Sequence, residues 1–178
     1  MPKTINLHCA CGATRLDVLG KPIASLECCC TSCRDGARRM ATRTAAPDVL
    51  TSYGAVPYVM IRKDRVHFTE GFDNLCEFRL TPNSKTRRVF AGCCNTPIFT
   101  EFESGHWVSL FAQLWPETSR PRVEMRTMVS DLPADAHLPN DVSNAQKFNL
   151  RIFPKLLGAW AAMRFKIPKM AATHKVDL

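Results

Sequence analysis

The chain has 178 residues, of which 46% are hydrophobic and 22% are charged, a composition typical of soluble globular proteins rather than disordered ones. Its formal net charge of +8 excludes an acidic protein and favours an anionic partner, although a basic surface can also serve solubility alone. No apolar run approaches the ~20 residues that a membrane-spanning helix requires, so we expect no membrane partner.

Short β-prone runs separated by glycine and proline begin the chain. They predict strands joined by tight turns, and these strands are expected over 4–9, 13–19 and 24–29. A short basic helix is predicted over 31–40, with Thr31 or Ser32 as its N-cap. This helix would begin inside a cluster of cysteines, where helix amide groups favour thiolates.

The same pattern continues more regularly through the middle of the chain. Turn signals at Gly54, Gly71 and Gly105 separate further β-prone runs, and this spacing favours a largely antiparallel β domain. The expected strands cover 56–62, 65–69, 75–80, 87–90, 98–102 and 107–111.

The remainder of the chain reads differently. Residues 115–140 are rich in Pro and Asp and predict surface loops with one strand over 123–128. Beyond them, Pro154 at a first-turn position precedes apolar residues at helical spacing, Leu156 and Leu157 among them. They predict a helix that ends before Pro168 and packs its apolar face on the domain; a membrane-surface or partner-binding helix is the alternative.

The length is enough for one compact domain and short for two. We therefore predict a single zinc-binding domain over 1–178, in which residues from about 113 to 178 form a loop and helix extension. The prediction of zinc comes from the cysteines.

Most of the 9 cysteines lie in three clusters, Cys9-Ala10-Cys11, Cys28 to Cys33 and Cys93-Cys94. Thiolates one or three residues apart can hold one cation, because a tight turn brings both sulfurs to about 2.3 Å from the metal. The cysteine count is odd, and residues 1–7 lack a signal-peptide pattern, so we expect a cytoplasmic location. In that compartment clustered cysteines are more often metal ligands or catalytic thiols than disulfides.

In motif order, the chain resembles the glutathione-dependent formaldehyde-activating enzyme family, which includes the centromere protein V relatives. The Cys-Cys-Asn-Thr-Pro form of the third cluster is most similar to an uncharacterised branch of that superfamily. The resemblance rests on Cys9-Ala10-Cys11-Gly12 before a strand, Cys28-x-Cys30-x-x-Cys33-Arg34 before a short helix, and residues 90–97 late in the sheet.

This resemblance implies a mainly β (α+β) fold, the β-tent of small antiparallel sheets, here with a C-terminal helix. It implies a structural zinc at Cys9 and Cys11 together with late cysteines. It also implies a second zinc at Cys28, Cys30 and Cys33, tied to carbon–sulfur lyase chemistry on the glutathione adduct of formaldehyde, with glutathione as co-substrate.

The third cluster departs from the family pattern. When Thr96 and Pro97 are aligned with the family, Cys94 matches the second late ligand and Ala91 occupies the place of the first. Cys93 can substitute only if the backbone turns there, because adjacent side chains in a strand point to opposite faces.

Asn95 tolerates a left-handed conformation and would supply that turn. We therefore expect Cys9, Cys11 and Cys94 to lie together, with Cys93 as the fourth ligand. A metal-free group of buried thiols is the alternative, because structural zinc is normally four-coordinate.

Three sulfurs from the second cluster leave the fourth position of a tetrahedral zinc for water or a substrate thiolate. A zinc-bound thiol stays deprotonated at neutral pH and is ready to form or break the carbon–sulfur bond of a thiohemiacetal. Arg34 follows directly and is predicted to bind a carboxylate of a peptide-like thiol, with an exposed helix arginine as the alternative. Cys29, where the family usually has histidine, and Cys76 are expected to be inert buried thiols.

Two functions of different classes follow. The cysteine motif favours a zinc-dependent carbon–sulfur lyase that acts on a small-molecule thiol adduct. The net charge favours a non-catalytic, zinc-stabilised binding module for an acidic partner or nucleic acid, of which nucleic acid is the less favoured because no base-stacking motif is present. A thiol redox or metal-buffering protein is a weaker third alternative.

Overall fold

The computed structural model describes residues 3–170 and 173–178, which contain twelve strands and two α-helices. The predicted class, mainly β (α+β) with a helix near the C-terminus, is confirmed. The helices are α1 (Thr31–Ala41) and α2 (Ile152–Ala162). The strands are β1 (Thr4–His8), β2 (Arg15–Leu19), β3 (Ala24–Cys28), β4 (Val56–Arg62), β5 (Val66–Glu70), β6 (Leu75–Phe78), β7 (Thr86–Ala91), β8 (Thr96–Phe102), β9 (Trp107–Phe111), β10 (Met125–Thr127), β11 (Ser143–Asn144) and β12 (His174–Lys175).

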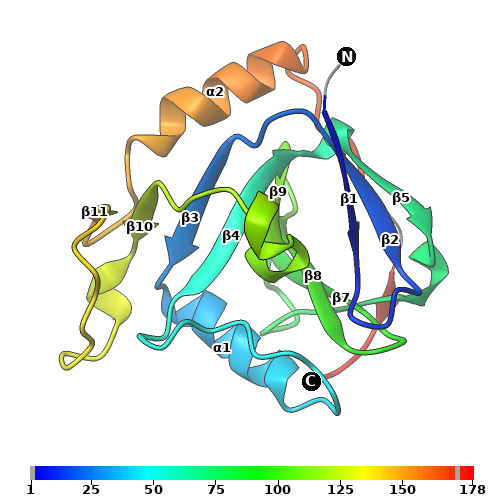
Figure 1. The fold of residues 1–178 in the computed structure, drawn as a ribbon, viewed down its shortest axis with the longest axis horizontal. Coiled ribbons are helices and arrows are strands. Elements are labelled where there is room, and N and C mark those ends of the chain that lie inside the picture. Colours follow the sequence, from blue (N-terminus) through cyan, green and yellow to red (C-terminus); the bar gives the residue numbers. More distant parts are fainter. Residues whose placement is uncertain (1–2, 171–172) are drawn as a thin grey trace.

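The strands form two sheets, seen at the right and in the centre of Figure 1. The smaller sheet has the order β1-β2-β5, and the larger has the order β11-β10-β3-β4-β9-β8-β7-β6-β12. Most neighbours are antiparallel, as expected, but β10 pairs in parallel with both β3 and β11, and β12 pairs in parallel with β6. The two-residue strands β11 and β12 carry no alternating pattern that sequence could reveal.

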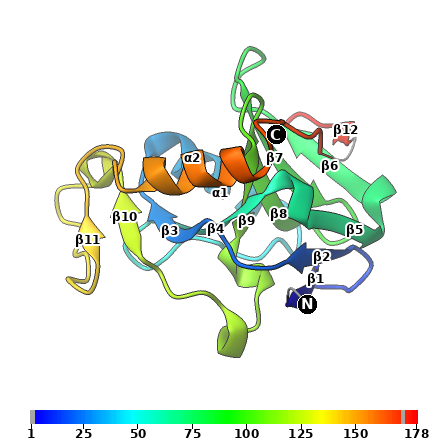
Figure 2. The same ribbon diagram turned by 90° about the horizontal axis from the view of Figure 1, so that it is seen from above.

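Two cores lie on opposite faces of the larger sheet. On β4, Val59 and Ile61 face the core shared with the smaller sheet, whereas Tyr58 and Met60 face a second core. Residues of α1 and α2 close this second core, so helices cover one face and a sheet covers the other (Figure 2). The cysteine clusters are divided in the same way, because Cys9 and Cys94 belong to the first core and Cys28 and Cys33 to the second.

Only a narrow strip of α2 is buried. Ile152 and Leu156 pack into the second core, but Leu157 is 60% exposed. The prediction that both leucines face the domain is therefore wrong for Leu157, because adjacent residues of a helix point in directions about 100° apart. No helix among the described residues has the length and hydropathy needed to cross a bilayer.

One histidine fastens α2 to the larger sheet. The imidazole Nε2 of His106 donates to the carbonyl of Leu156 at 2.9 Å, and its ring stacks on Trp160 with 5.6 Å between centroids. Burial lowers the pKa of His106 below its ordinary value of 6.5, although the hydrogen bond to Leu156 opposes this shift.

Because of this histidine, the stability of the fold is expected to decrease as the pH is lowered. Since the folded-state pKa lies below 6.5, the unfolded chain binds the proton more readily. The stability that neutral His106 contributes is thus present above pH 6.5 and is lost as the pH falls through the lowered pKa. Thermal unfolding across this range checks the prediction: His106→Gln should flatten the pH dependence, and His67→Gln, at an exposed position of β5, should not.

Candidate metal centres

The first and third cysteine clusters meet although more than eighty residues separate them. The sulfur of Cys93 lies 3.7 Å from that of Cys9 and 3.4 Å from that of Cys11. The sulfurs of Cys9 and Cys11 are 3.5 Å apart, and those of Cys93 and Cys94 are 3.9 Å apart. A tetrahedron with metal–sulfur bonds of about 2.3 Å has edges of about 3.8 Å. These four thiols, the four-cysteine site, are positioned to bind a metal ion, and their spacing fits zinc.

A turn between β7 and β8 brings adjacent cysteines to one site. Asn95 has a φ of 56°, the left-handed conformation expected from the sequence. Its side chain accepts a hydrogen bond from Arg43 Nε at 2.7 Å and donates one to the carbonyl of Thr44 at 3.0 Å. Because the chain leaves the strand before Cys93, the alternation that separates neighbouring side chains no longer applies, and Cys93 joins Cys94.

Hydrogen bonds at the four-cysteine site favour a thiolate at Cys94, whereas burial and hydrogen bonds with Cys11 and Cys9 raise the pKa of Cys93 to about 12. The backbone amide of Thr14 donates to the sulfur of Cys9 at 3.3 Å. Burial alone would raise the pKa of Cys94, but hydrogen bonds from the Thr96 hydroxyl and the Cys11 backbone lower it to about 6. A sulfur that is deprotonated near neutral pH is the form that binds a metal.

The second cluster forms a separate group at the end of β3 and the start of α1. The sulfurs of Cys28, Cys30 and Cys33, the three-cysteine site, lie within 4.8 Å of one another and are positioned to bind a metal ion. All three residues are half-buried. The group lies on the face of the larger sheet opposite the four-cysteine site.

The N-cap of α1 differs from the prediction. Cys30, rather than Thr31 or Ser32, caps the helix, and its sulfur accepts a hydrogen bond from the backbone amide of Cys33 at 3.3 Å. Thr31 instead donates its backbone amide to Asp131, and the Ser32 hydroxyl accepts a bond from Arg88. A sulfur at this position can replace the oxygen of an ordinary cap because a thiolate is also an acceptor.

The thiols of the three-cysteine site differ in pKa. Hydrogen bonds from Cys28 and Cys33, together with the Cys33 backbone amide and the charge of Arg88, lower the pKa of Cys30 to about 3. The hydrogen bonds that Cys28 makes with Cys30 and Cys33, together with burial, raise the pKa of Cys28. Of these sulfurs, that of Cys30 at the helix N-terminus therefore loses its proton more readily than that of Cys28.

Arg88 of β7 is a residue of this site that the sequence analysis missed. It is 1% exposed, and its Nη2 donates to the backbone carbonyl and hydroxyl of Ser32, both at 2.8 Å. Its Nη1 is buried without a hydrogen-bond partner among the described residues. A signal existed, because Arg87 and Arg88 are adjacent in a strand and one of them has to face inward.

Gly36 makes room for this guanidinium. A Cβ at Gly36 would lie 2.0 Å from Nε of Arg88, so any side chain there would displace the arginine. The positive charge of Arg88 favours the anionic forms of Cys30 and Cys33.

Arg34 is buried at 7% exposure, which removes the alternative of an exposed helix arginine. Its Nη1 donates to the carbonyl of Asp131 at 2.6 Å, and its Nε has no hydrogen-bond partner among the described residues. It lines a cavity of about 470 Å³ together with Tyr53, Gly54 and His137, among others. The cavity lining contains none of the three cysteines.

The other arginines of this region do not widen the Arg34 cavity. Arg38 pairs with Asp35 on the surface, Arg39 donates to the carbonyl of Leu178, and Arg43 lies over the ring of Phe90. None of them lines that cavity. Arg34 is therefore the only one of these four arginines that lines the cavity.

Of the remaining cysteines, Cys29 is buried as expected, whereas Cys76 is only half-buried. Cys29 is fully buried in a third small core with Ala55 and Val129. Burial, followed by the nearby charge of Glu27, raises the pKa of Cys29 to about 11, so this thiol stays protonated. Cys76 packs at the edge of the second core and belongs to neither metal group.

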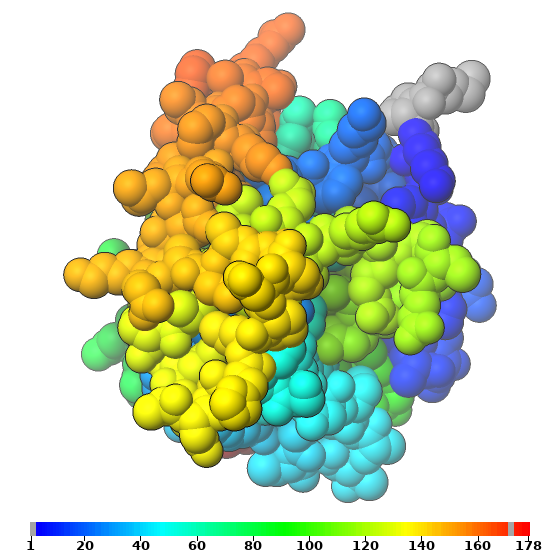
Figure 3. Space-filling model, turned by 60° about the vertical axis from the view of Figure 1, so that its left-hand side comes forward, coloured from blue at the N-terminus to red at the C-terminus, as the bar shows by residue number. Residues whose placement is uncertain are grey.

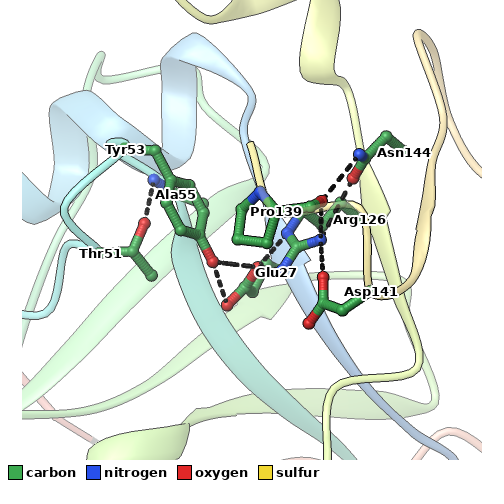
Figure 4. Close-up of polar contacts among 8 residues, drawn as sticks. All are labelled: Glu27, Thr51, Tyr53, Ala55, Arg126, Pro139, Asp141 and Asn144. Carbon is green, nitrogen blue, oxygen red and sulfur yellow. Dashed lines mark hydrogen bonds and ion pairs between the residues drawn. The ribbon is translucent and has the colours of Figure 1, made fainter. Parts of the chain in front are cut away.

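A buried ionic network supports β3 where it enters the three-cysteine site (Figure 4). Arg126 of β10 is directly opposite Glu27 in the parallel pairing, and its Nε lies 2.6 Å from the Glu27 carboxylate. The Tyr53 hydroxyl donates to both oxygens of the same carboxylate, at 2.9 and 2.8 Å. Asp141 and the carbonyl of Pro139 satisfy Nη1 of Arg126, at 2.7 and 3.1 Å.

The metal-binding groups lie within the part of the chain that matches a known family model. That model, described as a family of unknown function (DUF6151), matches residues 1–115. No curated protein matches the chain. Among solved structures, a crystal structure of a Rhodobacter sphaeroides protein from a structural genomics programme is similar, with 14% sequence identity, a TM-score of 0.47, and coverage of 67% of this chain and 97% of that chain.

Proposed function

Because the chain belongs to a family of unknown function (DUF6151), its activity has to be inferred from its own site, and we propose a zinc-dependent carbon–sulfur lyase. Its substrate would be the adduct of an aldehyde with a small-molecule thiol of the glutathione type. The three-cysteine site is the observation that carries this proposal: three half-buried sulfurs gathered at a helix N-terminus.

The two cysteine groups suit different roles. Four sulfurs complete a tetrahedral coordination shell, so the four-cysteine site would hold a structural ion. Three sulfurs leave one position for a ligand from solution, which is the pattern of a catalytic site. When bound there, zinc would supply a Lewis acid that keeps a substrate thiol in its thiolate form at neutral pH.

The chain's own residues would prepare the site for an anionic sulfur. Arg88 compensates negative charge beside the sulfurs, and Cys30 is held as a thiolate by Cys28, Cys33 and the helix amide. Arg34, which lines a cavity beside the helix, would bind a carboxylate of the thiol substrate. These contacts favour a small acidic thiol over a neutral one.

The reaction proposed is the reversible cleavage of a thiohemiacetal. The carbon–sulfur bond breaks and its electron pair goes to sulfur, which leaves as a thiolate. The hydroxyl oxygen becomes the carbonyl oxygen of the aldehyde, and its proton passes to solvent. Atoms and charge balance without an oxidant or reductant, so the site needs no redox cofactor for this step.

Metal content and exchange kinetics test the proposal together. The purified chain should bind two zinc ions, and Cys28→Ala should lose one of them. Cys76→Ala is the matched control, because both thiols are half-buried against the second core and only Cys28 belongs to a metal group. Exchange between formaldehyde, glutathione and their adduct, followed by NMR, should accelerate with wild type and Cys76→Ala only.

The outcomes separate the candidate functions. Exchange that stays at the uncatalysed rate although two ions are bound would contradict the lyase and leave a zinc-stabilised binding module. Retention of both ions by Cys28→Ala would contradict the three-cysteine site itself. Arg34→Gln should raise the concentration of glutathione needed for half-maximal exchange without changing metal content.

A further inference from the structure

The positive charge of the chain is concentrated near its C-terminus. Residues 142–176, the basic segment, contain seven of the 24 lysines and arginines and none of the 16 aspartates and glutamates. The rest of the chain is therefore close to neutral. A general role of charge in solubility would not require this separation, so the basic segment needs its own explanation.

The same segment carries most of the exposed large apolar side chains. Eight such residues are exposed in the described part of the chain, and six of them lie between positions 148 and 167. These six are Phe148, Leu150, Phe153, Leu157, Phe165 and Ile167. Single exposed apolar residues are ordinary, but a group gathered on one helix and its flanking residues indicates an interaction surface.

The exposed residues form a strip along the outside of α2. Phe148 and Phe153 contact each other at the start of the helix, with 5.3 Å between ring centroids, and Trp160 and Phe165 do so at its end, also at 5.3 Å. Leu157 lies between these two pairs in the sequence and is the most exposed large apolar residue inside α2. Figures 1 and 2 show α2 on the outside of the molecule.

Basic side chains accompany this strip. Arg151 immediately precedes α2, Arg164 and Lys166 follow it, and all three are exposed. Lys155 lies on the helix itself and pairs with Glu124 of the neighbouring chain segment. In the space-filling view this orange segment projects from the upper left of the molecule (Figure 3). Because this projection is convex, it suits a partner surface into which its own side chains can insert.

We propose that α2 and its flanking residues dock on the surface of an anionic lipid membrane. The helix would lie parallel to the surface, with Phe153 and Leu157 inserted between headgroups and Arg151, Arg164 and Lys166 against lipid phosphates. Helices with a face rich in Phe, Leu and Trp and with Lys and Arg at its borders bind membranes in this way. The contact is peripheral, since α2 has 11 residues and does not span a bilayer.

The charge of the basic segment favours a lipid surface over a second copy of the chain as the partner of the strip. A symmetric dimer through α2 would bring each basic segment against its own copy, with no acidic residue in the segment to pair with it. A lipid surface instead supplies uniform negative charge together with an apolar layer, which matches both properties of the strip. The sequence predicts no membrane partner because no apolar run reaches the length of a membrane-spanning helix, and it leaves a membrane-surface helix as the alternative to a helix packed on the domain.

Vesicle binding by the full-length, metal-loaded chain tests the proposal. Sedimentation with vesicles of phosphatidylcholine mixed with phosphatidylserine should carry the protein down, and vesicles of phosphatidylcholine alone should not. Each of Phe153→Ser and Leu157→Ser should weaken the partition coefficient by about tenfold or more. Each of Arg151→Gln and Lys166→Gln should weaken it roughly fivefold, and added salt should reduce binding further.

Phe72→Ser provides the matched control, because Phe72 is 53% exposed and Phe153 is 54% exposed, but Phe72 lies outside the basic segment. This variant should bind vesicles like wild type. Circular dichroism and metal content should be unchanged in all five variants, because every substituted side chain is exposed. A loss of binding in Phe72→Ser would show a general effect of surface apolarity and overturn the proposal.

Each alternative partner of the strip would give a distinct experimental result. Concentration-dependent self-association that Leu157→Ser abolishes, without vesicle binding, would identify the strip as a dimer interface and overturn the lipid assignment. Binding to polyglutamate but not to anionic vesicles would assign it to an acidic protein partner and overturn it as well. Neither result tests the proposed lyase activity, because that activity is measured by exchange kinetics in the absence of lipid.

Discussion

Replacing Cys9 with alanine is expected to remove one metal ion per chain and to destabilise the fold strongly. Cys9 is fully buried in the first core and its sulfur contacts those of Cys11 and Cys93, so it connects the smaller sheet to the turn between β7 and β8. Structural zinc contributes apparent binding free energies of about 10–16 kcal/mol in small zinc domains. Loss of only about 4 kcal/mol would lower the Tm of a chain of this size by roughly 8–16 °C.

Cys29→Ala is the control for this experiment. Both cysteines are fully buried, but Cys29 belongs to no metal group, so its replacement removes a sulfur without removing a ligand. The measurement is metal per chain together with thermal unfolding, with and without a chelator. Equal metal content in the two variants, with a chelator that leaves the wild-type Tm unchanged, would show that the four-cysteine site stabilises the fold without a metal.

Arg126→Met is expected to cost about 3–5 kcal/mol of unfolding free energy, because it leaves the buried Glu27 carboxylate without its cation. The Tyr53 hydroxyl would remain as a partner of Glu27, but a neutral donor does not balance a buried charge. Chemical denaturation gives the free energy. The loss should be smaller in the double variant Glu27→Gln, Arg126→Met, in which no charge is stranded.

Asp141→Asn tests whether the effect arises from the buried pair. Asp141 also pairs with Arg126, but its side chain is largely exposed, so this variant should unfold close to wild type. If Arg126→Met and Asp141→Asn were equally mild, the network in Figure 4 would be a surface feature without energetic weight. If the double variant were less stable than Arg126→Met alone, the stranded-charge explanation would fail.

The features that sequence predicted well are those set by short-range rules. Runs of β-prone residues bounded by turn signals located β4 and β9 to the residue, because both faces of those strands contact a core. The spacing of Cys28, Cys30 and Cys33 predicted a shared site because a single turn of chain connects them. The left-handed conformation of Asn95 followed from its side-chain chemistry, and it accounts for the position of Cys93.

The features that sequence missed depend on contacts between distant segments. Nothing in the local pattern shows that Arg88 lies against Gly36, or that Arg126 is opposite Glu27 in a parallel pair. The cap of α1 was misassigned because Thr31 is engaged by Asp131, one hundred residues away. The exposed strip of α2 was missed because helical periodicity shows which residues share a face but not how much of that face the domain covers.

The pairing of β10 with β3 also bears on how the protein is made. Cys28 to Cys33 leave the ribosome long before Arg126 and Asp131, the residues that complete their surroundings. The surroundings of the three-cysteine site are therefore complete only after synthesis has passed residue 131.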